Sequence, residues 1–102
     1  MNTISRTENQ ALARTVLELD VYNHPGVMSH VVGLFSRRAY NVEGILVMPV
    51  GGGVTSRIWL LVNEDERLDQ MVKQVEKLED VLAVRRHGAE HEVFVRLEEF
   101  FR

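Results

Sequence analysis

Hydrophobic and polar residues alternate near the start of the chain, in the segment 15–22. Leu17 and Leu19 occupy every second position, and they alternate with Glu18 and Asp20. A period of two places the apolar side chains on one face of an extended chain and the carboxylates on the other. The pattern therefore predicts a β-strand with one buried face.

The next segment changes to a helical period. Its apolar side chains recur three and four residues apart, which is the spacing of one buried face on an α-helix. These residues are Val27, Val31, Leu34 and Phe35. Pro25 lacks a backbone N–H and suits the first turn of this helix, and we expect the helix to end near Ala39.

Three further strands and a second helix complete the pattern. Residues 42–50 and 55–62 are rich in β-branched and aliphatic side chains, and the glycines 51–53 separate them. This arrangement predicts an antiparallel hairpin. Apolar side chains return to helical spacing over 68–78, and a short apolar run at 81–84 is the fourth predicted strand.

The order of predicted elements, βαββαβ, is that of an α+β ferredoxin-like fold. Right-handed crossovers place two helices on one face of a four-stranded antiparallel sheet. We expect a flexible leader over 1–12, one domain over 13–88, and a C-terminal tail over 89–102. In the tail, Val93 and Leu97 fit the period of a strand as well as that of a helix, and we favour a short helix.

Composition narrows the classes of function. The 102 residues include 15 acidic and 12 basic side chains, and the formal charge of −3 disfavours a nucleic-acid binder. The absence of cysteine excludes disulfides, thiolate metal sites and cysteine nucleophiles. No apolar run approaches the ~20 residues of a membrane span, and the start of the chain lacks an apolar signal core. We therefore expect a cytoplasmic protein that binds no membrane.

Histidine, glycine and tryptophan residues offer weak candidates for chemistry. His87 and His91 are four residues apart, but Gly88 lies between them and a zinc site needs three or four ligands. The glycines 51–53 lack the Lys-Ser/Thr of a phosphate loop, so we favour a hairpin connector. We interpret Trp59 as a core or subunit-contact residue. No serine–histidine–carboxylate arrangement stands out, so we expect no catalytic and no metal-binding residues.

The junction Asn23-His24-Pro25-Gly26-Val27-Met28 is the strongest candidate for a binding site. A strand ends here directly before a helix, whose first amides lack intrahelical partners and whose dipole favours negative charge. Gly26 permits close approach of a ligand to the backbone, and Asn23 offers both a donor and an acceptor. The junction suits a small carboxylate such as a free amino acid, and an ordinary capped helix is the alternative.

This junction, together with the segment GLFSRRAYNVEGI (33–45), resembles the ACT domain of acetohydroxyacid synthase (acetolactate synthase) small subunits. The segments IWLLVN (58–63) and KLEDV (77–81) strengthen the resemblance. The motif HPGVM and the short length of the chain most resemble the isozyme I type of bacterial regulatory subunit. The likeness covers residues 14–86, so we identify 13–88 as an ACT domain. Activities that belong to the additional C-terminal domain of longer relatives are not carried over.

The resemblance implies a regulatory subunit and not an enzyme. Such a subunit binds and activates the catalytic large subunit of acetohydroxyacid synthase and confers feedback inhibition by valine in branched-chain amino acid biosynthesis. Thiamin diphosphate, magnesium and FAD belong to the large subunit, so this chain is expected to hold no cofactor. Family ACT domains also form homodimers, often side by side through their sheet edges, and bind the effector at the dimer interface. The effector-binding positions that transfer to this sequence are Asn23, His24, Pro25, Gly26, Val27, Met28 and Asn41.

From the residues and the resemblance together, we expect the amides after Pro25 to hold the effector carboxylate. Asn23 and Asn41, from different protomers, would orient its polar groups. An apolar wall would accept the isopropyl group, and its candidate residues are Val27, Met28, Val42 and Ile45. Two other functions stay open: an ACT amino-acid sensor with a different partner or effector, and a small ferredoxin-like enzyme, which the lack of a catalytic arrangement disfavours.

The sequence leaves two candidate surfaces for the large subunit. One is a set of basic side chains that could complement an acidic patch, although solvated arginines are the ordinary case. These are Arg37, Arg38, Arg85 and Arg86. The other is the apolar end of the chain, which could equally fold back on the sheet. Its residues are Phe94, Leu97, Phe100 and Phe101.

Overall fold

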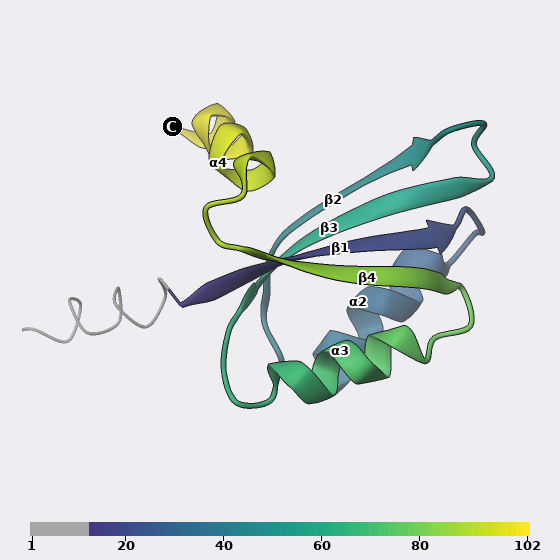
Figure 1. Ribbon diagram of the computed structural model, residues 1–102, viewed down its shortest axis with the longest axis horizontal. Helices are drawn as coiled ribbons and strands as arrows, with labels where there is room; N and C mark the ends of the chain where they lie inside the picture. The colour runs from purple at the N-terminus through teal and green to yellow at the C-terminus, as the bar shows by residue number, and fades with distance from the viewer. Residues whose placement is uncertain (1–12) are drawn as a thin grey trace, which may run out of the picture.

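The computed structural model of the protein describes residues 13–102, so the leader expected over 1–12 lies outside the described residues. Figure 1 shows a twisted sheet with helices α2 and α3 on one face, and α4 on the opposite side. The elements in chain order are β1 (Arg14–Tyr22), α2 (Val27–Arg37), β2 (Val42–Val50), β3 (Thr55–Asn63), α3 (Leu68–Glu76), β4 (Val81–Gly88), α4 (Glu92–Glu98) and the 3₁₀ turn η1 (Glu99–Phe101). None of these described helices is long and apolar enough to cross a membrane.

The strand order across the sheet is β2-β3-β1-β4, and each neighbouring pair is antiparallel. Two strand–helix–strand units interleave in this order because each helix crosses back over the same face of the sheet. The architecture confirms the ferredoxin-like βαββαβ fold. It also leaves β2 and β4 as the two edge strands.

The core lies between the sheet and the two helices α2 and α3. From β1 it takes Leu17, Leu19 and Val21, which are fully buried and confirm the alternation seen in the sequence. The helices contribute residues at the predicted spacing, which are Val31, Leu34, Phe35, Leu68, Met71 and Val75. Burial of each such side chain is worth about 1.5–3 kcal/mol, so this layer fixes which face of the sheet the helices cover.

Helix α2 begins later and ends earlier than predicted. Gly26 is the N-cap with φ 87°, so Pro25 lies in the turn before the helix and not in its first turn. Glycine adopts this left-handed conformation without strain, and here it redirects the chain from strand to helix. At the other end the helix stops at Arg37. Ala39 has φ 53°, a left-handed backbone angle with which a right-handed helix cannot continue.

The second helix and the fourth strand also differ from their predicted lengths. Helix α3 ends at Glu76, and Leu78 packs against the core from the turn that follows. Strand β4 extends past Val84 to Gly88 because β1 continues to pair with it. Its second half, residues 85–87, is polar and therefore gave no apolar strand pattern.

The sequence of the tail fits both a strand and a helix, and the structure shows the helix, as α4 and η1. It lies on the face of the sheet opposite α2 and α3, which carries Val16, Glu18 and Asp20 of β1 and is called the open face below. Phe94 of α4 is buried against Gly44 of β2, where a Cβ would lie 2.8 Å from Phe94 Cε1. Only glycine permits this approach, so the end of the chain covers part of the open face.

Candidate functional site

The β1–α2 loop is exposed at the end of β1 and is fixed to the β2–β3 hairpin through Asn23. The backbone N–H of Asn23 donates to Val54 O at 2.9 Å. Its side-chain Nδ2 donates to Gly53 O, also at 2.9 Å. The glycines 51–53 connect β2 and β3, which confirms the hairpin interpretation of that run. One flank of the loop is therefore held at the turn that joins β2 to β3, next to the start of β3.

His24 holds the other flank of the loop. Its Nδ1 lies 2.9 Å from Asp80 Oδ1, and its ring stacks on Tyr22 with centroids 5.7 Å apart. The backbone N–H of Tyr22 donates to Asp80 O at 2.9 Å. His24 thus anchors the loop to the turn before β4. Sequence reasoning missed Asp80, because an acidic residue before a strand is common and its partner is remote along the chain.

The N-terminus of α2 has no side-chain cap among the described residues. Gly26 occupies the N-cap position, the Val27 N–H donates within the loop, and the first turn contains no acidic residue. The first amide to donate to the N-cap carbonyl is that of His30, to Gly26 O at 3.0 Å. The amides of Met28 and Ser29 precede it and lack intrahelical acceptors. These N–H groups and the helix dipole favour an anion at this point.

Asn41 lies at the opposite end of the sheet from Asn23. It is exposed and immediately precedes β2, where Val42 pairs with Val62 of β3. Strand β2 runs for nine residues from there to the hairpin that holds Asn23, a length of roughly 30 Å. One protomer therefore does not bring the two asparagines together. That they meet from different protomers stays a prediction.

The four candidates for the apolar wall fall into two pairs. The side chain of Val27 is buried in the core, and Val42 packs against that core. Met28 and Ile45 are exposed, Met28 in the first turn of α2 and Ile45 on the edge strand β2. Val27 and Val42 therefore serve the fold, and Met28 and Ile45 remain accessible to a ligand.

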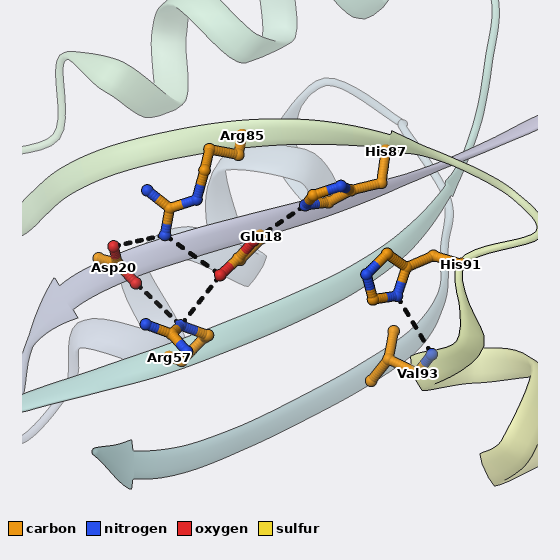
Figure 2. A network of polar contacts seen from close by, with 7 residues as sticks. All are labelled: Glu18, Asp20, Arg57, Arg85, His87, His91 and Val93. Carbon is orange, nitrogen blue, oxygen red and sulfur yellow. Dashed lines mark hydrogen bonds and ion pairs between the residues drawn. The ribbon is translucent and has the colours of Figure 1, made fainter. Parts of the chain in front are cut away.

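A second polar cluster lies on the open face of the sheet (Figure 2). Glu18 Oε2 lies 3.1 Å from Arg57 Nε and 3.1 Å from Arg85 Nη2. Asp20 bridges the same two guanidinium groups, at 3.0 Å from Arg57 and 2.5 Å from Arg85. His87 Nε2 lies 2.9 Å from the other oxygen of Glu18. Three neighbouring strands, β1, β3 and β4, are thereby joined by side chains as well as by backbone hydrogen bonds.

This network keeps both of its carboxylates ionised. The hydrogen bond from Arg85 lowers the pKa of Glu18, against the opposing effect of burial. Burial raises the pKa of Asp20, but hydrogen bonds from Arg85 and Arg57 outweigh it, so that the pKa falls below its usual value. Each carboxylate is satisfied by guanidinium groups of the same chain, so the cluster is suited to stabilising the sheet and not to acid–base chemistry.

His87 and His91, the two histidines considered above as metal ligands, lie beside Trp59. The rings of His87 and His91 are 4.7 Å apart, and Trp59 lies 4.8 Å from His91, half-buried on the open face. His91 Nδ1 accepts from the Val93 N–H at 3.1 Å and so caps α4. His87 is held by Glu18. Within the part of the chain that the structure describes, no group of three or more His, Cys, Asp or Glu is placed for a metal ion.

The four arginines weighed as a partner surface differ in their surroundings. Arg85 belongs to the open-face network, and Arg86 Nη1 lies 2.6 Å from Asp69 Oδ1 of α3. Arg37 and Arg38 are exposed at the end of α2. The positive charge of the first pair is compensated within this chain, so Arg37 and Arg38 remain the candidates for an acidic partner.

Comparison with known proteins gives the family of the chain. A family model described as "AHAS small subunit-like ACT domain" matches residues 17–83. The chain is 52% identical over 94 residues to the acetolactate synthase isozyme 1 small subunit of Escherichia coli K12, covering 92% of this chain and 98% of that protein. It is 41% identical over 76 residues to the isozyme 3 small subunit of the same organism, covering 74% of this chain and 47% of that protein.

Solved structures agree with this assignment. The crystal structure of the acetolactate synthase small subunit from Thermotoga maritima superposes with a TM-score of 0.67 and 32% identity, over 78% of this chain and half (50%) of that chain. The ACT domain of the GTP pyrophosphokinase from Chlorobium tepidum superposes with a TM-score of 0.58 over 72% of this chain and 96% of that chain. At 15% identity, this second likeness shows the fold alone. The chain belongs to the acetolactate synthase small-subunit family and carries the ACT domain of that family.

Proposed function

We propose that this chain is the regulatory subunit of an acetolactate synthase. It binds the catalytic large subunit in the cytoplasm, raises its activity, and confers feedback inhibition by valine in branched-chain amino acid biosynthesis. Beside the family membership, one observation carries the proposal: the start of α2 lacks a side-chain cap and lies in an exposed loop held on both flanks. Thiamin diphosphate, magnesium and FAD are bound by the catalytic subunit, and this chain holds no cofactor.

The carboxylate of valine binds at the start of α2. The amides of Met28 and Ser29 donate to it, because neither has an acceptor within the helix. Gly26 presents no side chain, and a Cβ built there would meet no atom within 4 Å, so the approach to the backbone is open. The positive end of the helix dipole adds to the attraction for the carboxylate.

The complete effector site needs two protomers. Asn23 is bonded to the hairpin at the end of β2, and Asn41 precedes the start of β2. If two β2 edges pair antiparallel about a two-fold axis, the start of one strand lies beside the end of the other. Asn41 of one protomer then lies next to the partner's Asn23. A homodimer through β2 is therefore the assembly that unites the predicted effector-binding residues.

The isopropyl group of valine lies against the exposed apolar side chains at this junction. Met28 flanks the helix N-terminus that receives the carboxylate, and Ile45 lies on the pairing edge of β2. The β2 pairing keeps Ile45 near the middle of the interface, so Met28 is the exposed apolar side chain nearer to the carboxylate. An aliphatic amino acid therefore matches both parts of the site, the amides that bind its carboxylate and the apolar side chains that contact its isopropyl group.

Inhibition follows if valine binds the inhibited arrangement of the complex more tightly than the active one. Typical allosteric couplings of about 1–3 kcal/mol correspond to roughly 5–150-fold changes in affinity. An effector that bridges two protomers fixes the geometry of their dimer, and the dimer is what the catalytic subunit meets. The site thereby acts on catalysis without holding a catalytic residue.

A second candidate is an ACT amino-acid sensor with another effector or partner, since the uncapped helix start accepts any small carboxylate. Titration of the purified chain with valine, leucine, isoleucine and glycine separates the two. Preference for another amino acid, with no stimulation of an acetolactate synthase large subunit, favours the second candidate. Turnover by the isolated chain favours an enzyme.

The decisive experiment replaces Gly26. The variant Gly26→Asp places a carboxylate where the effector carboxylate binds, so repulsion and occupied space both oppose valine. We expect the valine concentration for half-inhibition of the reconstituted holoenzyme to rise at least tenfold, or about 1.4 kcal/mol, with activation of the large subunit retained.

The matched control is Gly26→Asn, which has the same shape, carries no charge and tolerates a left-handed φ. We expect a smaller shift from Gly26→Asn than from Gly26→Asp. Undiminished valine sensitivity of the Gly26→Asp holoenzyme would place the effector elsewhere.

A further inference from the structure

The C-terminal segment formed by α4 and η1 exposes most of its apolar side chains. Phe94 is the one residue that the described segment buries. Phe100 is 84% exposed and Phe101 is 82% exposed. In Figure 1 the segment stands out from the sheet near the start of β2. Residues 92–101 also lie beyond the part of the chain that the family model matches, so their role is not given by the ACT domain itself.

An apolar groove of about 740 Å³ lies between this segment and the first half of β2. Its apolar lining comes from both sides and comprises, among others, Gly44, Ile45, Leu61, Phe94, Leu97 and Phe101, and four charged side chains, with Arg14 and Glu43 among them, border it. Because β2 is an edge strand, one wall of the groove is the strand edge that is left unpaired within residues 13–102. Any strand that pairs with this edge therefore also meets α4 and η1.

The second half of β2 has the chemistry that suits this groove. The segment 46–50 is Leu-Val-Met-Pro-Val and carries no charge, and its Met48 is 61% exposed. Met48 pairs with Arg57 and Gly44 pairs with Leu61, so both lie on the open face of the sheet, as the groove does. One protomer thus presents an apolar groove at the start of β2 and an exposed apolar side chain near its end.

Two-fold pairing brings these two features together. Full overlap of two antiparallel β2 strands centres the axis on Leu46 and sets Gly44 opposite the partner's Met48. Neighbouring strands are about 4.8 Å apart, so the partner's Met48 enters the groove beside Phe94. The same contact forms twice in the dimer, as an isologous interface requires.

The backbone ladder between the two strands is incomplete at this place. Full overlap sets Pro49 opposite the partner's Glu43, which lies at the irregularity between Val42 and Gly44. Pro49 has no N–H to donate, and a bulge disrupts pairing. Side-chain packing must replace the missing backbone hydrogen bonds at both ends of the ladder.

We infer that the α4–η1 segment of each protomer is a dimer clasp, which closes over the partner's β2 and buries the partner's Met48. The inference rests on the proposed homodimer through β2. The clasp adds apolar contact where the ladder is weakest, and it lies at the same end of β2 as Asn41. It therefore joins the C-terminal end of the chain to the interface at which the effector binds.

Cysteine cross-linking of the full chain tests the clasp, since the sequence contains no cysteine. A mixture of two single variants, Met48→Cys and Leu97→Cys, allows subunit exchange before oxidation. We expect a disulfide-linked dimer from the mixture. Met48→Cys alone should give little, because the two copies of position 48 lie roughly 13 Å apart along the strands and a disulfide needs Cα atoms within about 7 Å.

The variant Leu46→Cys separates failure of the clasp from failure of the dimer. Position 46 meets its own copy at the axis, so Leu46→Cys alone should form a disulfide-linked dimer if β2 pairs with β2. Cross-linking of Leu46→Cys without cross-linking of the mixture overturns the clasp and leaves the dimer in place. Absence of both cross-links overturns the proposed dimer as well.

A second measurement needs no cysteine. Phe101 lines the groove and Phe100 does not, although both are exposed to the same degree. We expect Phe101→Ser to raise the dimer dissociation constant about tenfold in sedimentation, and Phe100→Ser to leave it within about twofold. Equal effects of the two substitutions would overturn the clasp.

Discussion

On the face covered by α2 and α3, β1 presents Leu17 and Leu19, while the same strand presents Glu18 and Asp20 on the open face. The helix-covered face is filled by aliphatic and aromatic side chains from every element that borders it. The open face carries ion pairs in its middle, and helix α4 covers it at one end. The helix-covered face is stabilised by apolar packing, whereas the open face is stabilised by ion pairs and by the helix that covers one end of it. Different conditions should therefore destabilise the two faces.

The largest effect is expected on the helix-covered face. Leu19→Ala leaves a cavity in a fully buried position, and we expect the free energy of unfolding to fall by about 2–5 kcal/mol. Leu82→Ala, at an exposed position of β4, is the matched control and should change it by no more than about 0.5 kcal/mol. Denaturant unfolding followed by circular dichroism measures both, and equal losses would contradict the division between the faces.

On the open face, Glu18→Gln should cost less. The variant keeps the shape of the side chain but removes the charge that binds Arg57, Arg85 and His87. Hydrogen bonds to charged groups contribute about 1.5–3 kcal/mol, so we expect a loss in the free energy of unfolding of about 1–3 kcal/mol at neutral pH. A loss greater than that of Leu19→Ala would reverse the proposed order of the two faces.

Acid should distinguish the faces further. The folded-state pKa of Glu18 lies below its ordinary 4.5, so its stabilising contribution is present above that value and is lost as the pH falls through the folded pKa. Asp20 contributes in the same direction. The natural chain should therefore lose more stability than Glu18→Gln between neutral pH and about pH 3. Parallel pH profiles of the two proteins would show that the network is not the origin of the acid sensitivity.

The smallest effect concerns the cap of α4. His91→Ala removes the acceptor of the Val93 N–H, and we expect a loss of about 0.5–2 kcal/mol in the stability of that segment. His91→Asn lacks the ring but keeps a side-chain acceptor, so it should recover most of the loss. Trp59, whose ring lies 4.8 Å from that of His91, reports the change by fluorescence during denaturation. Identical behaviour of the two variants would assign the effect to ring stacking.

The periodicity of the sequence was enough to predict the helix-covered face. Leu17, Leu19 and the helical stripe of α2 follow periods of two and 3.6, and burial enforces those periods directly. Helix boundaries were harder to predict, because the position of Gly26 and the left-handed Ala39 depend on single backbone angles. The end of β4 was missed because its second half is polar: Arg85 and His87 bind Glu18 on the open face and Arg86 binds Asp69 of α3.

The candidate site was predictable in its parts but not in its assembly. The start of α2 stands out in the sequence because proline and glycine mark it, and the structure shows it without a side-chain cap. The bond from His24 to Asp80 and the bond from Asn23 to Gly53 join residues far apart in the chain. Local patterns carry no information on such contacts, and the strand register was needed to show that Asn41 lies at the opposite end of β2.

The β1–α2 loop is tethered on both of its flanks, to the hairpin through Asn23 and to Asp80 through His24 and Tyr22. A backbone that is already ordered loses little conformational entropy when a ligand arrives, so more of the contact energy appears as affinity. The proposed amino-acid effector is small and offers few contacts, and a preorganised loop would compensate for that. The same two tethers connect the loop to the β2–β3 turn and to the turn before the edge strand β4, so the proposed effector would act on both places from one point.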